Sequence, residues 1–400
     1  MDLRDTPTEE RFRAELREWL HEAVPSMGHE PARTDWAGRR AWDMGWQRKL
    51  HEAGYAGINW PREYGGRGAT PTEHLIFIEE TERARAPYVG MNFVGVLHAG
   101  PTLIAEATPA QKSFHLPGIL TGEHVWCQGF SEPDAGSDLA SLRTQAVRDG
   151  DDYVITGQKI WTSFGHVADY CEMLVRTDPE APKHRGITWL ILPMKSPGVD
   201  VRPLQTMEGT TEFCEVFFDE VRVPVVNRVG DENDGWRVTM VTLSFERGTA
   251  LASDVLESME LVRDLVELAR KLTSGRASRW EDAGLRRDIG RIAAQFDALW
   301  ALTKRNVTQA ERSDEGAVGG NVFKVAWSDL RQRLGDVSMR LLDRASLSIE
   351  DVGDLPTGRH VHARFYALSM AIAGGTSQIS RNIIAERTLG LPKERSWTSS

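Results

Sequence analysis

The hydrophobic period of this chain changes twice, and this change constrains the fold more than any other feature. Up to about Leu120, apolar residues such as Phe12 and Leu16 recur at the three- to four-residue spacing of amphipathic helices. From about Val125 to Val226 the apolar runs are short and rich in β-branched and aromatic residues, with Gly, Pro and Asp turns between them. Beyond Asn233 the helical spacing returns. The order predicts helices, then a small β-barrel or sandwich, then helices.

The predicted boundaries are an N-terminal helical domain over 1–124, a central β-domain over 125–230 and a C-terminal helical bundle over 231–400. Thr8 is the expected N-cap of the first helix, and Pro71 is expected to begin another. Residues 101–119 predict two short helices joined at a Pro turn. Later helices are expected over 291–311, 321–342 and 377–389, and a long one carries an apolar seam formed by Leu251, Val255, Met259, Val262, Val266 and Ala269.

Composition excludes several classes of protein. The formal net charge of −10 over 400 residues, with no Lys/Arg-dense tract, argues against nucleic-acid binding. No apolar run approaches the ~18–20 residues of a membrane span, and the charged N-terminus lacks a signal-peptide pattern. Cys127, Cys171 and Cys214 are odd in number and widely spaced, so they match neither a disulfide framework nor a metal site. A cytoplasmic protein with reduced thiols is expected.

Two short segments carry the chemical signal. Gly129-Phe-Ser-Glu-Pro-Asp-Ala-Gly-Ser-Asp138 crowds small residues, turn formers and hydroxyls together, which suits a loop whose backbone N–H groups approach a ligand closely. Lys159-Ile-Trp-Thr-Ser163 puts an indole and two hydroxyls at the end of a β-like run. A lone tryptophan in a strand is more often a core residue, so the second segment gains its meaning from the first.

Together these segments resemble the flavin-binding segments of the acyl-CoA dehydrogenase family, and the likeness extends over nearly the whole chain. The loop Asn59–Gly68 resembles the family's Pro-x-x-Tyr-Gly-Gly-x-Gly, and Phe218–Pro224 resembles the strand that ends its β-domain. The family's architecture, with N-terminal helices, a central β-domain and a C-terminal four-helix bundle, has the same order as the periods above. The resemblance therefore implies an α+β fold of this type and bound FAD.

The resemblance assigns site residues one by one. In the β-domain, the residues expected to line the flavin are Gln128, Phe130, Ser131, Ser137, Trp161, Thr162 and Ser163. Ser137 also lies where the family's substrate enters, and Ser163 lies where a hydroxyl contacts flavin N5 or O4. In the C-terminal region, the loop expected to close over the flavin contributes Gly375, Thr376 and Gln378.

The implied reaction removes a proton from the carbon α to a thioester and a hydride from the β-carbon, giving a trans-2-enoyl-CoA. Most members carry the basic Glu directly before the closing Gly-Thr, but this chain has Gly374 there. A minority branch supplies it from the first long helix of the bundle, just before an arginine, where this chain has Glu246 and Arg247. Burial beside an acyl chain makes such a carboxylate a stronger base. Most Glu-Arg dipeptides are merely solvated surface pairs.

Three functions remain open for this chain. In a dehydrogenase, the backbone N–H of Gly374 could polarise the thioester carbonyl, and the missing side chain would leave room for a branched or polycyclic acyl group such as a steroid side chain. Arg247 could then orient the base or contact the coenzyme A arm. Alternatively, the chain is a non-catalytic subunit that scaffolds FAD and substrate for an active partner. A third possibility is an oxidase or monooxygenase on the same fold, since fold does not determine chemistry.

The family's two adenosine-contacting motifs are missing. Where Arg-x-x-Phe-Gly and Gln-x-x-Gly-Gly-x-Gly are usual, this chain has Gly275–Trp280 and Asp343–Ile349. The chain resembles some actinobacterial-type members with a helix-borne Glu that share this loss and pair with a different subunit, which restores the missing contacts. FAD could then be held jointly with a partner chain. We therefore expect either a homo-oligomer, dimeric or tetrameric, or a heteromer with a second acyl-CoA dehydrogenase-like subunit. An electron-transferring flavoprotein is the expected acceptor.

Overall fold

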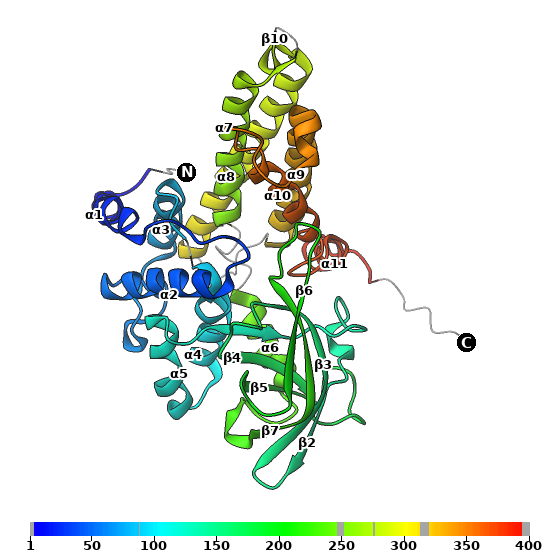
Figure 1. Ribbon diagram of the computed structural model, residues 1–400. Helices are drawn as coiled ribbons and strands as arrows, with labels where there is room; N and C mark the ends of the chain where they lie inside the picture. The colour runs from blue at the N-terminus through cyan, green and yellow to red at the C-terminus, as the bar shows by residue number, and fades with distance from the viewer. Residues whose placement is uncertain (1–3, 88, 246–251, 275–276, 313–319, 394–400) are drawn as a thin grey trace. The chain divides into compact units, whose positions relative to one another are not determined.

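The computed structural model describes residues 4–87, 89–245, 252–274, 277–312 and 320–393 (Figure 1). The chain forms two compact units, one of residues 5–250 and one of residues 251–400 with the first four residues. Each unit has its own hydrophobic core. Among the described residues, no helix is long and apolar enough to cross a membrane.

The first unit begins with helices that pack on one another around a shared core. They are α1 (Pro7–Ala23), α2 (Trp36–Glu52), α3 (Pro71–Arg83), α4 (Gly100–Glu106) and α5 (Pro109–Thr121), with a π-helical turn, η4 (Val94–Ala99), before α4. The helix from Pro71 and the two short helices around Pro109 were predicted from the sequence. Helix α2 was not, because its buried face includes the polar residues Asp43 and Gln47 and so lacks a plain apolar period.

The predicted N-cap Thr8 is wrong, since α1 is capped by Thr6. The Thr6 hydroxyl accepts the Glu9 N–H at 3.4 Å, and the Glu9 carboxylate accepts the Thr6 N–H at 2.6 Å. Pro7 follows the cap at the first helical position, where its missing N–H costs nothing. The Thr-x-x-Glu spacing of this capping box was the signal that identifies Thr6.

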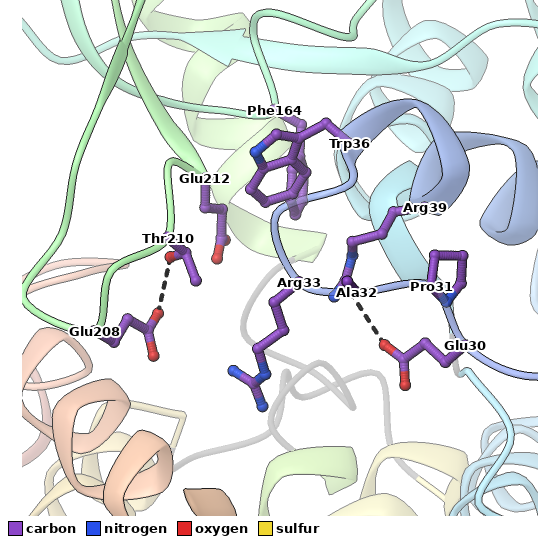
Figure 2. A pocket seen from close by; sticks show the side chains of 10 residues that line it. All are labelled: Glu30, Pro31, Ala32, Arg33, Trp36, Arg39, Phe164, Glu208, Thr210 and Glu212. Carbon is purple, nitrogen blue, oxygen red and sulfur yellow. Dashed lines mark hydrogen bonds and ion pairs between the residues drawn. The ribbon is translucent and has the colours of Figure 1, made fainter. Parts of the chain in front are cut away.

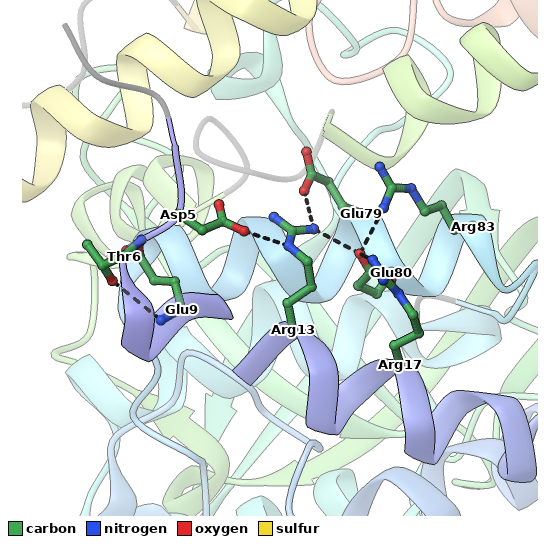
Figure 3. A network of polar contacts seen from close by, with 8 residues as sticks. All are labelled: Asp5, Thr6, Glu9, Arg13, Arg17, Glu79, Glu80 and Arg83. Carbon is green, nitrogen blue, oxygen red and sulfur yellow. Dashed lines mark hydrogen bonds and ion pairs between the residues drawn. The ribbon is translucent and has the colours of Figure 1, made fainter. Parts of the chain in front are cut away.

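A buried carboxylate ties α1 to α3 (Figure 3). Glu80 is only 2 % exposed, and its oxygens lie 2.8 Å from Arg13 Nη1, 2.9 Å from Arg17 Nε and 3.1 Å from Arg83 Nη1. Burial alone would raise the pKa of Glu80, but the hydrogen bonds and charges of the guanidinium groups outweigh it and lower that pKa. The three arginines therefore keep an ionised group inside this helix pair.

The central β-domain contains one eight-stranded sheet with the order β6-β7-β3-β2-β4-β5-β8, and β1 lies parallel to β4. Its strands are β1 (Trp126–Gly129), β2 (Gln145–Asp149), β3 (Asp152–Ser163), β4 (Tyr170–Arg176), β5 (Ile187–Pro193), β6 (Val199–Leu204), β7 (Phe213–Pro224) and β8 (Arg228–Val229). Strand β2 meets β4 only at Gln145 and Arg176, so the sheet has two halves joined at one point.

Strand β4 is buried on both faces, which explains its unbroken apolar run. Cys171, Met173 and Val175 point into the core between the two halves of the sheet, whereas Leu174 points into the core shared with the N-terminal helices. This alternation follows from the two-residue repeat of a strand. Helix α6 (Gly235–Phe245) packs against β5, α4 and η4 and so belongs to the same unit.

The second unit is a helical bundle in which α9 contacts each of the other long helices. Its helices are α7 (Ala252–Lys271), α8 (Ala283–Arg312), α9 (Gly320–Leu342), α10 (Gly358–Ser369) and α11 (Ser377–Ile383), followed by a π-helical turn (Ile384–Thr388).

The seam predicted for α7 was too narrow. Val255, Val262 and Ala269 are buried as expected, but Met259 and Val266 are only partly buried. Leu261, Leu265 and Leu268, which the seam omitted, are also buried, because α7 packs against both α8 and α9 and so buries a wider face. Leu251 lies outside the described residues.

Candidate active site

The two sequence motifs of the β-domain are held against each other. The Ile160 N–H donates to the Ser131 carbonyl at 3.0 Å. Lys159 Nζ donates to the Phe130 carbonyl at 3.1 Å and to Glu132 Oε1 at 2.8 Å. The loop after β1 and the end of β3 therefore form one structural element, although about 30 positions of sequence separate them at most.

The Lys159–Glu132 pair is buried, since the two side chains are 0 % and 7 % exposed. Glu132 also accepts the backbone N–H groups of Arg143 at 2.6 Å and Thr144 at 2.9 Å. Burial would raise the pKa of Glu132, but the Lys159 ammonium and these hydrogen bonds lower it. A carboxylate whose acceptors are filled and whose pKa is low is a poor proton acceptor, so the pair is a structural brace rather than a base.

A β-bulge turns Trp161 outward. The register between β3 and β7 shifts between Lys159 and Thr162, and Trp161 has a left-handed φ of 62°. Its indole is 59 % exposed and meets Phe213 edge to face, with 5.9 Å between ring centroids. Such backbone strain is typical of functional sites, and bulges often re-aim a side chain beside them. Trp161 is therefore not the core residue that a lone strand tryptophan usually is.

The two residues after Trp161, Thr162 and Ser163, are less exposed than the indole and differ from each other in burial. Thr162 is fully buried, and its hydroxyl has no hydrogen-bond partner among the described residues. Ser163 is half-buried at the end of β3. Of these two hydroxyls, that of Ser163 is the one a ligand outside the strand can reach, and Thr162 offers such a ligand its backbone only.

The side chains of the first motif differ in how far they are exposed to solvent. Phe130 is buried at 4 % exposure, Gln128 and Ser131 are half-buried, and Ser137 is exposed in the loop beyond Glu132. The Gln128 side chain lies on the sheet face that packs on the helices. The exposed loop has open space around it, since a Cβ added at Gly136 would meet nothing within 4 Å.

Two buried polar residues beside Gln128 were missed by the sequence analysis. Gln128 Nε2 lies 2.8 Å from Glu172 Oε1 and 3.4 Å from His98 Nδ1. Glu172 is 0 % exposed and His98 is 12 % exposed. The signal for Glu172 was present, because a charged residue stands in an otherwise apolar run, Cys171–Val175. His98 had no local signal, since only the fold brings η4 to β1.

In the second unit, a lysine of α9 holds the backbone of the predicted closing loop. Gly374 and Gly375 have left-handed φ values of 59° and 88° and are exposed. Lys324 of α9, only 8 % exposed, donates to the carbonyl oxygens of Ala373 and Gly375. The sequence did not indicate Lys324, because 49 residues separate it from Ala373.

The other residues of this loop begin a helix. The Thr376 hydroxyl accepts the Ile379 N–H at 3.1 Å and so caps α11, while Gln378 is exposed in its first turn. The Thr376 side chain therefore already has a structural use, and Gln378 presents a free amide surface to any ligand of this unit.

Glu246 and Arg247 lie outside the described residues. The helix before them is described, and it is attached to α4: the hydroxyl oxygens of Thr102 in α4 and Thr242 in α6 lie 2.9 Å apart. Both threonines are fully buried. The predicted base, Glu246, thus follows α6 in the sequence. Helix α6 packs against α4 and against η4, which carries His98.

The described residues of the β-domain fit a flavin. An exposed indole held by a bulge supplies an apolar face, and an open loop with a free hydroxyl lies against the same segment. In holding FAD, Trp161, Ser163 and Gln128 would contact the ring system, and Ser137 with its loop would contact the more polar part.

A cleft of about 350 Å³ opens near the end of β3 (Figure 2). It contains none of the predicted site residues, and its link to them is Phe164, which follows Ser163 directly. Phe164 packs on Trp36 with 5.9 Å between ring centroids, and the Trp36 indole donates to the Thr211 hydroxyl at 2.8 Å. The remaining lining is strongly charged and consists of Glu30, Arg33, Arg39, Glu208 and Glu212, with Pro31, Ala32 and Thr210.

The order of N-terminal helices, central sheet and C-terminal helices is the three-domain architecture of flavin-dependent acyl-CoA dehydrogenases. The chain belongs to the acyl-CoA dehydrogenase family. Family models match it for the N-terminal domain over residues 6–123, the middle domain over 127–221 and the C-terminal domain over 233–389. The fold and family predicted from the sequence are confirmed, and the chain is an oxidoreductase of a family that acts on acyl-CoA in lipid and steroid β-oxidation.

The chain is similar to curated relatives and to solved structures over almost its full length. Acyl-CoA dehydrogenase IpdE1 of Mycobacterium tuberculosis is 38 % identical over 397 residues, covering 96 % of this chain and 98 % of that protein. Acyl-CoA dehydrogenase FadE26 of the same organism is 35 % identical, covering 98 % and 99 %. The structure described as Tcur3481-Tcur3483 steroid ACAD superposes with a TM-score of 0.85 at 33 % identity, covering 98 % of this chain and 100 % of that chain. The ChsE4-ChsE5 complex of M. tuberculosis gives a TM-score of 0.83 at 34 % identity, with the same coverage.

The buried brace makes a first prediction. Glu132→Gln removes the charge that compensates the Lys159 ammonium at 0 % exposure, so the free energy of unfolding should fall by about 3–5 kcal/mol. Chemical denaturation measures it. Asp200→Asn is the matched control, because the Asp200–Arg202 pair is exposed and should contribute less than about 1 kcal/mol. Equal losses in the two variants would contradict the brace.

The cleft makes a second prediction. Burial, then the charge of Glu208, raises the pKa of Glu212 from 4.5 to about 7, against the opposing effect of Arg39 and Arg33. Because the folded protein holds this proton more tightly than the unfolded chain, the stabilisation is complete below pH 4.5 and is lost as the pH rises to about 7.

Glu212→Gln cannot ionise, so its stability relative to the unmodified protein should increase across that pH window and then level off. The free energy of unfolding, measured by denaturant titration at intervals from pH 4.5 to about 8, tests this. Glu123→Gln, on an exposed residue, is the control. A stability difference that does not change with pH would show that Glu212 ionises normally.

Proposed function

We propose that the chain catalyses the FAD-dependent α,β-dehydrogenation of an acyl-CoA thioester to a trans-2-enoyl-CoA. The observation that carries this proposal is the junction of the two motifs by Lys159, which leaves the strained Trp161 indole exposed beside the loop of Ser137. The indole and the residues around Ser137 are exposed, so these two groups do not serve the packing of the β-domain. Relatives named acyl-CoA dehydrogenases over nearly the full length support the same reaction.

In this mechanism Glu246 takes the proton from the carbon α to the thioester. Gly374 supplies a backbone N–H that hydrogen-bonds the thioester carbonyl and so stabilises negative charge as the proton leaves. Arg247 orients the carboxylate or contacts the coenzyme A arm. Bound FAD supplies the hydride acceptor. Gly375, Thr376 and Gln378 would help to hold the flavin from the closing loop, and Trp161 and Ser163 would help to hold its ring system.

Lys324 gives the Gly374–Gly375 loop a defined geometry. Two carbonyl groups of the loop are tied to one ammonium, so the backbone between them has little freedom. A peptide N–H that is held in place before the substrate arrives needs no reorganisation during proton transfer, which is what makes such a donor effective. The chain therefore provides the support that the proposed role of Gly374 requires.

A third prediction tests the base. Glu246→Gln should still bind FAD, but on anaerobic mixing with acyl-CoA its flavin should be reduced at least roughly 10²-fold more slowly, since a positioned general base contributes 10²–10⁴-fold. Loss of flavin absorbance in a stopped-flow instrument measures the rate. Glu267→Gln, on an exposed residue of α7, is the control. An unchanged rate in Glu246→Gln would remove Glu246 from the mechanism.

The second candidate function is a non-catalytic subunit that scaffolds FAD and substrate for an active partner. Gly374 in place of the usual Glu is the feature that favours it. The same experiment separates the two functions. If the unmodified protein binds FAD but its flavin is not reduced by acyl-CoA, either alone or with a partner subunit, the scaffold is correct and the dehydrogenase assignment is not.

The proposed substrate is an acyl-CoA with a branched or ring-bearing acyl group, such as a steroid side chain. A Cβ added at Gly374 would meet only Lys324 Nζ, at 3.7 Å, so this position is roomy. A solved structure at 33 % identity is described as a steroid acyl-CoA dehydrogenase, which supports the same class. The proposed partners are a second acyl-CoA dehydrogenase-like subunit, as in the ChsE4-ChsE5 complex, or further copies of this chain, and an electron-transferring flavoprotein.

The cytoplasmic location is also part of the proposal. Cys127, Cys171 and Cys214 are buried and form no disulfide, which is the state that a reducing compartment maintains.

A fourth prediction concerns substrate shape. For acyl groups of equal carbon number, kcat/KM should be at least roughly tenfold higher for a ring-bearing than for a straight-chain thioester. Gly374→Val should lower the ring-bearing value more than the straight-chain one, because it fills the open position. Gly353→Val is the matched control, since Gly353 has a similar φ of 62° and open surroundings. Preference for straight chains would exclude this substrate class.

A further inference from the structure

The buried group around Gln128 is the strongest feature that the proposed mechanism leaves unused. Gln128 and Glu172 are direct neighbours in the parallel pairing of β1 with β4, and both lie on the helix-facing side of the sheet. The residues around them on that face, Trp126 and Leu174, are fully buried and apolar. A carboxylate at 0 % exposure in such surroundings costs several kcal/mol unless hydrogen bonds compensate it.

The hydrogen bonds determine which way the Gln128 amide faces. A carboxylate has acceptor oxygens only, so the group 2.8 Å from Glu172 must be the NH₂ of Gln128. His98 Nδ1 lies 3.4 Å from the same NH₂ and 3.7 Å from Glu172 Oε1, so the imidazole borders both groups.

The position of His98 supports a functional role for this arrangement. His98 belongs to η4, a π-helical turn, and such turns are rare and frequently occur at functional sites. Its ring is held edge-on to Phe93, with 5.6 Å between centroids, and its carbonyl accepts the Thr102 hydroxyl at 2.8 Å. Contacts to both the ring and the backbone carbonyl therefore hold His98 in place, and its ring in turn contacts the Gln128 amide.

We propose that Glu172, together with His98, is a positioning residue that locks the Gln128 amide, so that position 128 recognises a hydrogen-bond donor of the ligand through its carbonyl oxygen. Gln128 is half-buried whereas Glu172 is fully buried, so Gln128 is the member of the pair that a ligand can reach. The donor is an N–H of the flavin or an O–H of the acyl group. This inference rests on the proposed function for the identity of the ligand, but not for the lock itself.

The lock is tested first in the FAD-free protein by ¹H–¹⁵N NMR of side-chain NH₂ groups. The Gln128 signal, assigned by its loss in Gln128→Met, should exchange slowly with solvent and should move in Glu172→Gln, where an amide replaces the carboxylate and either orientation of Gln128 becomes possible. A Gln128 signal with the exchange rate of an exposed glutamine, unchanged in Glu172→Gln, would overturn the proposal. If the lock is present but the unmodified protein binds no FAD, the proposed function fails and the lock stands.

The role of the lock is tested by a double-mutant cycle on FAD affinity and on acyl-CoA affinity. Glu172→Gln should weaken the affinity for the recognised ligand about five- to tenfold, the effect of one lost hydrogen bond. In the Gln128→Met background it should have no further effect, because Glu172 acts through Gln128. Additive losses would mean that Glu172 acts by itself and would overturn the proposal. Glu80→Gln, at an equally buried carboxylate on α3, controls for general loosening.

Two probes identify the donor. FAD methylated at N3 lacks the flavin N–H, and a deoxy acyl-CoA lacks the hydroxyl of its hydroxylated counterpart. The probe that lacks the recognised donor should bind the unmodified protein about five- to tenfold more weakly than its parent, and this difference should vanish in Gln128→Met. If the unmodified protein binds each probe as tightly as its parent ligand, Gln128 does not recognise a hydrogen-bond donor and the inference is wrong.

Discussion

The ion pair between Lys159 and Glu132 is the contact on which the candidate site depends. It joins the loop after β1 to the end of β3 inside the β-domain, where a salt bridge gains little stability over apolar packing but is costly to break. Its value here is geometric. Lys159, held by Glu132 and the Phe130 carbonyl, stands at the start of the bulge in β3 at which Trp161 turns outward. The strain at Trp161 is therefore maintained by contacts within the domain and does not need a ligand.

Three carboxylates of the first unit, two of them buried and one partly buried, fall into two kinds. Glu80 and Glu132 are surrounded by guanidinium, ammonium or backbone N–H donors, and both have lowered pKa values, so they serve as fixed anions that join segments. Glu212 has only the more distant charges of Arg39 and Arg33, and burial raises its pKa to about 7. A carboxyl group of the second kind changes charge near neutral pH, which fits the wall of an open cleft better than a structural contact.

The sequence predicted the parts of this molecule that are governed by local rules. The change of period and the start of a helix at Pro71 are local, and each was found. Thr6 was missed although its capping box is local, because Thr8 also precedes acidic residues. Lys324 and His98 could not be found, since their partners lie at distant positions in the sequence. Glu246 and Arg247, which lie outside the described residues, remain predictions from the resemblance alone.

The anchoring of the closing loop bears on why a base at position 374 would be ineffective here. A side chain at Gly374 would have to adopt a left-handed φ of 59°, which is unfavourable for L-residues but not prohibitive. Its Cβ would also lie 3.7 Å from Lys324 Nζ. An ammonium at that range lowers the pKa of a carboxylate and so weakens it as a base. The lysine that holds the glycine loop thus favours a loop that offers backbone N–H groups, with the proton acceptor supplied from elsewhere in the chain.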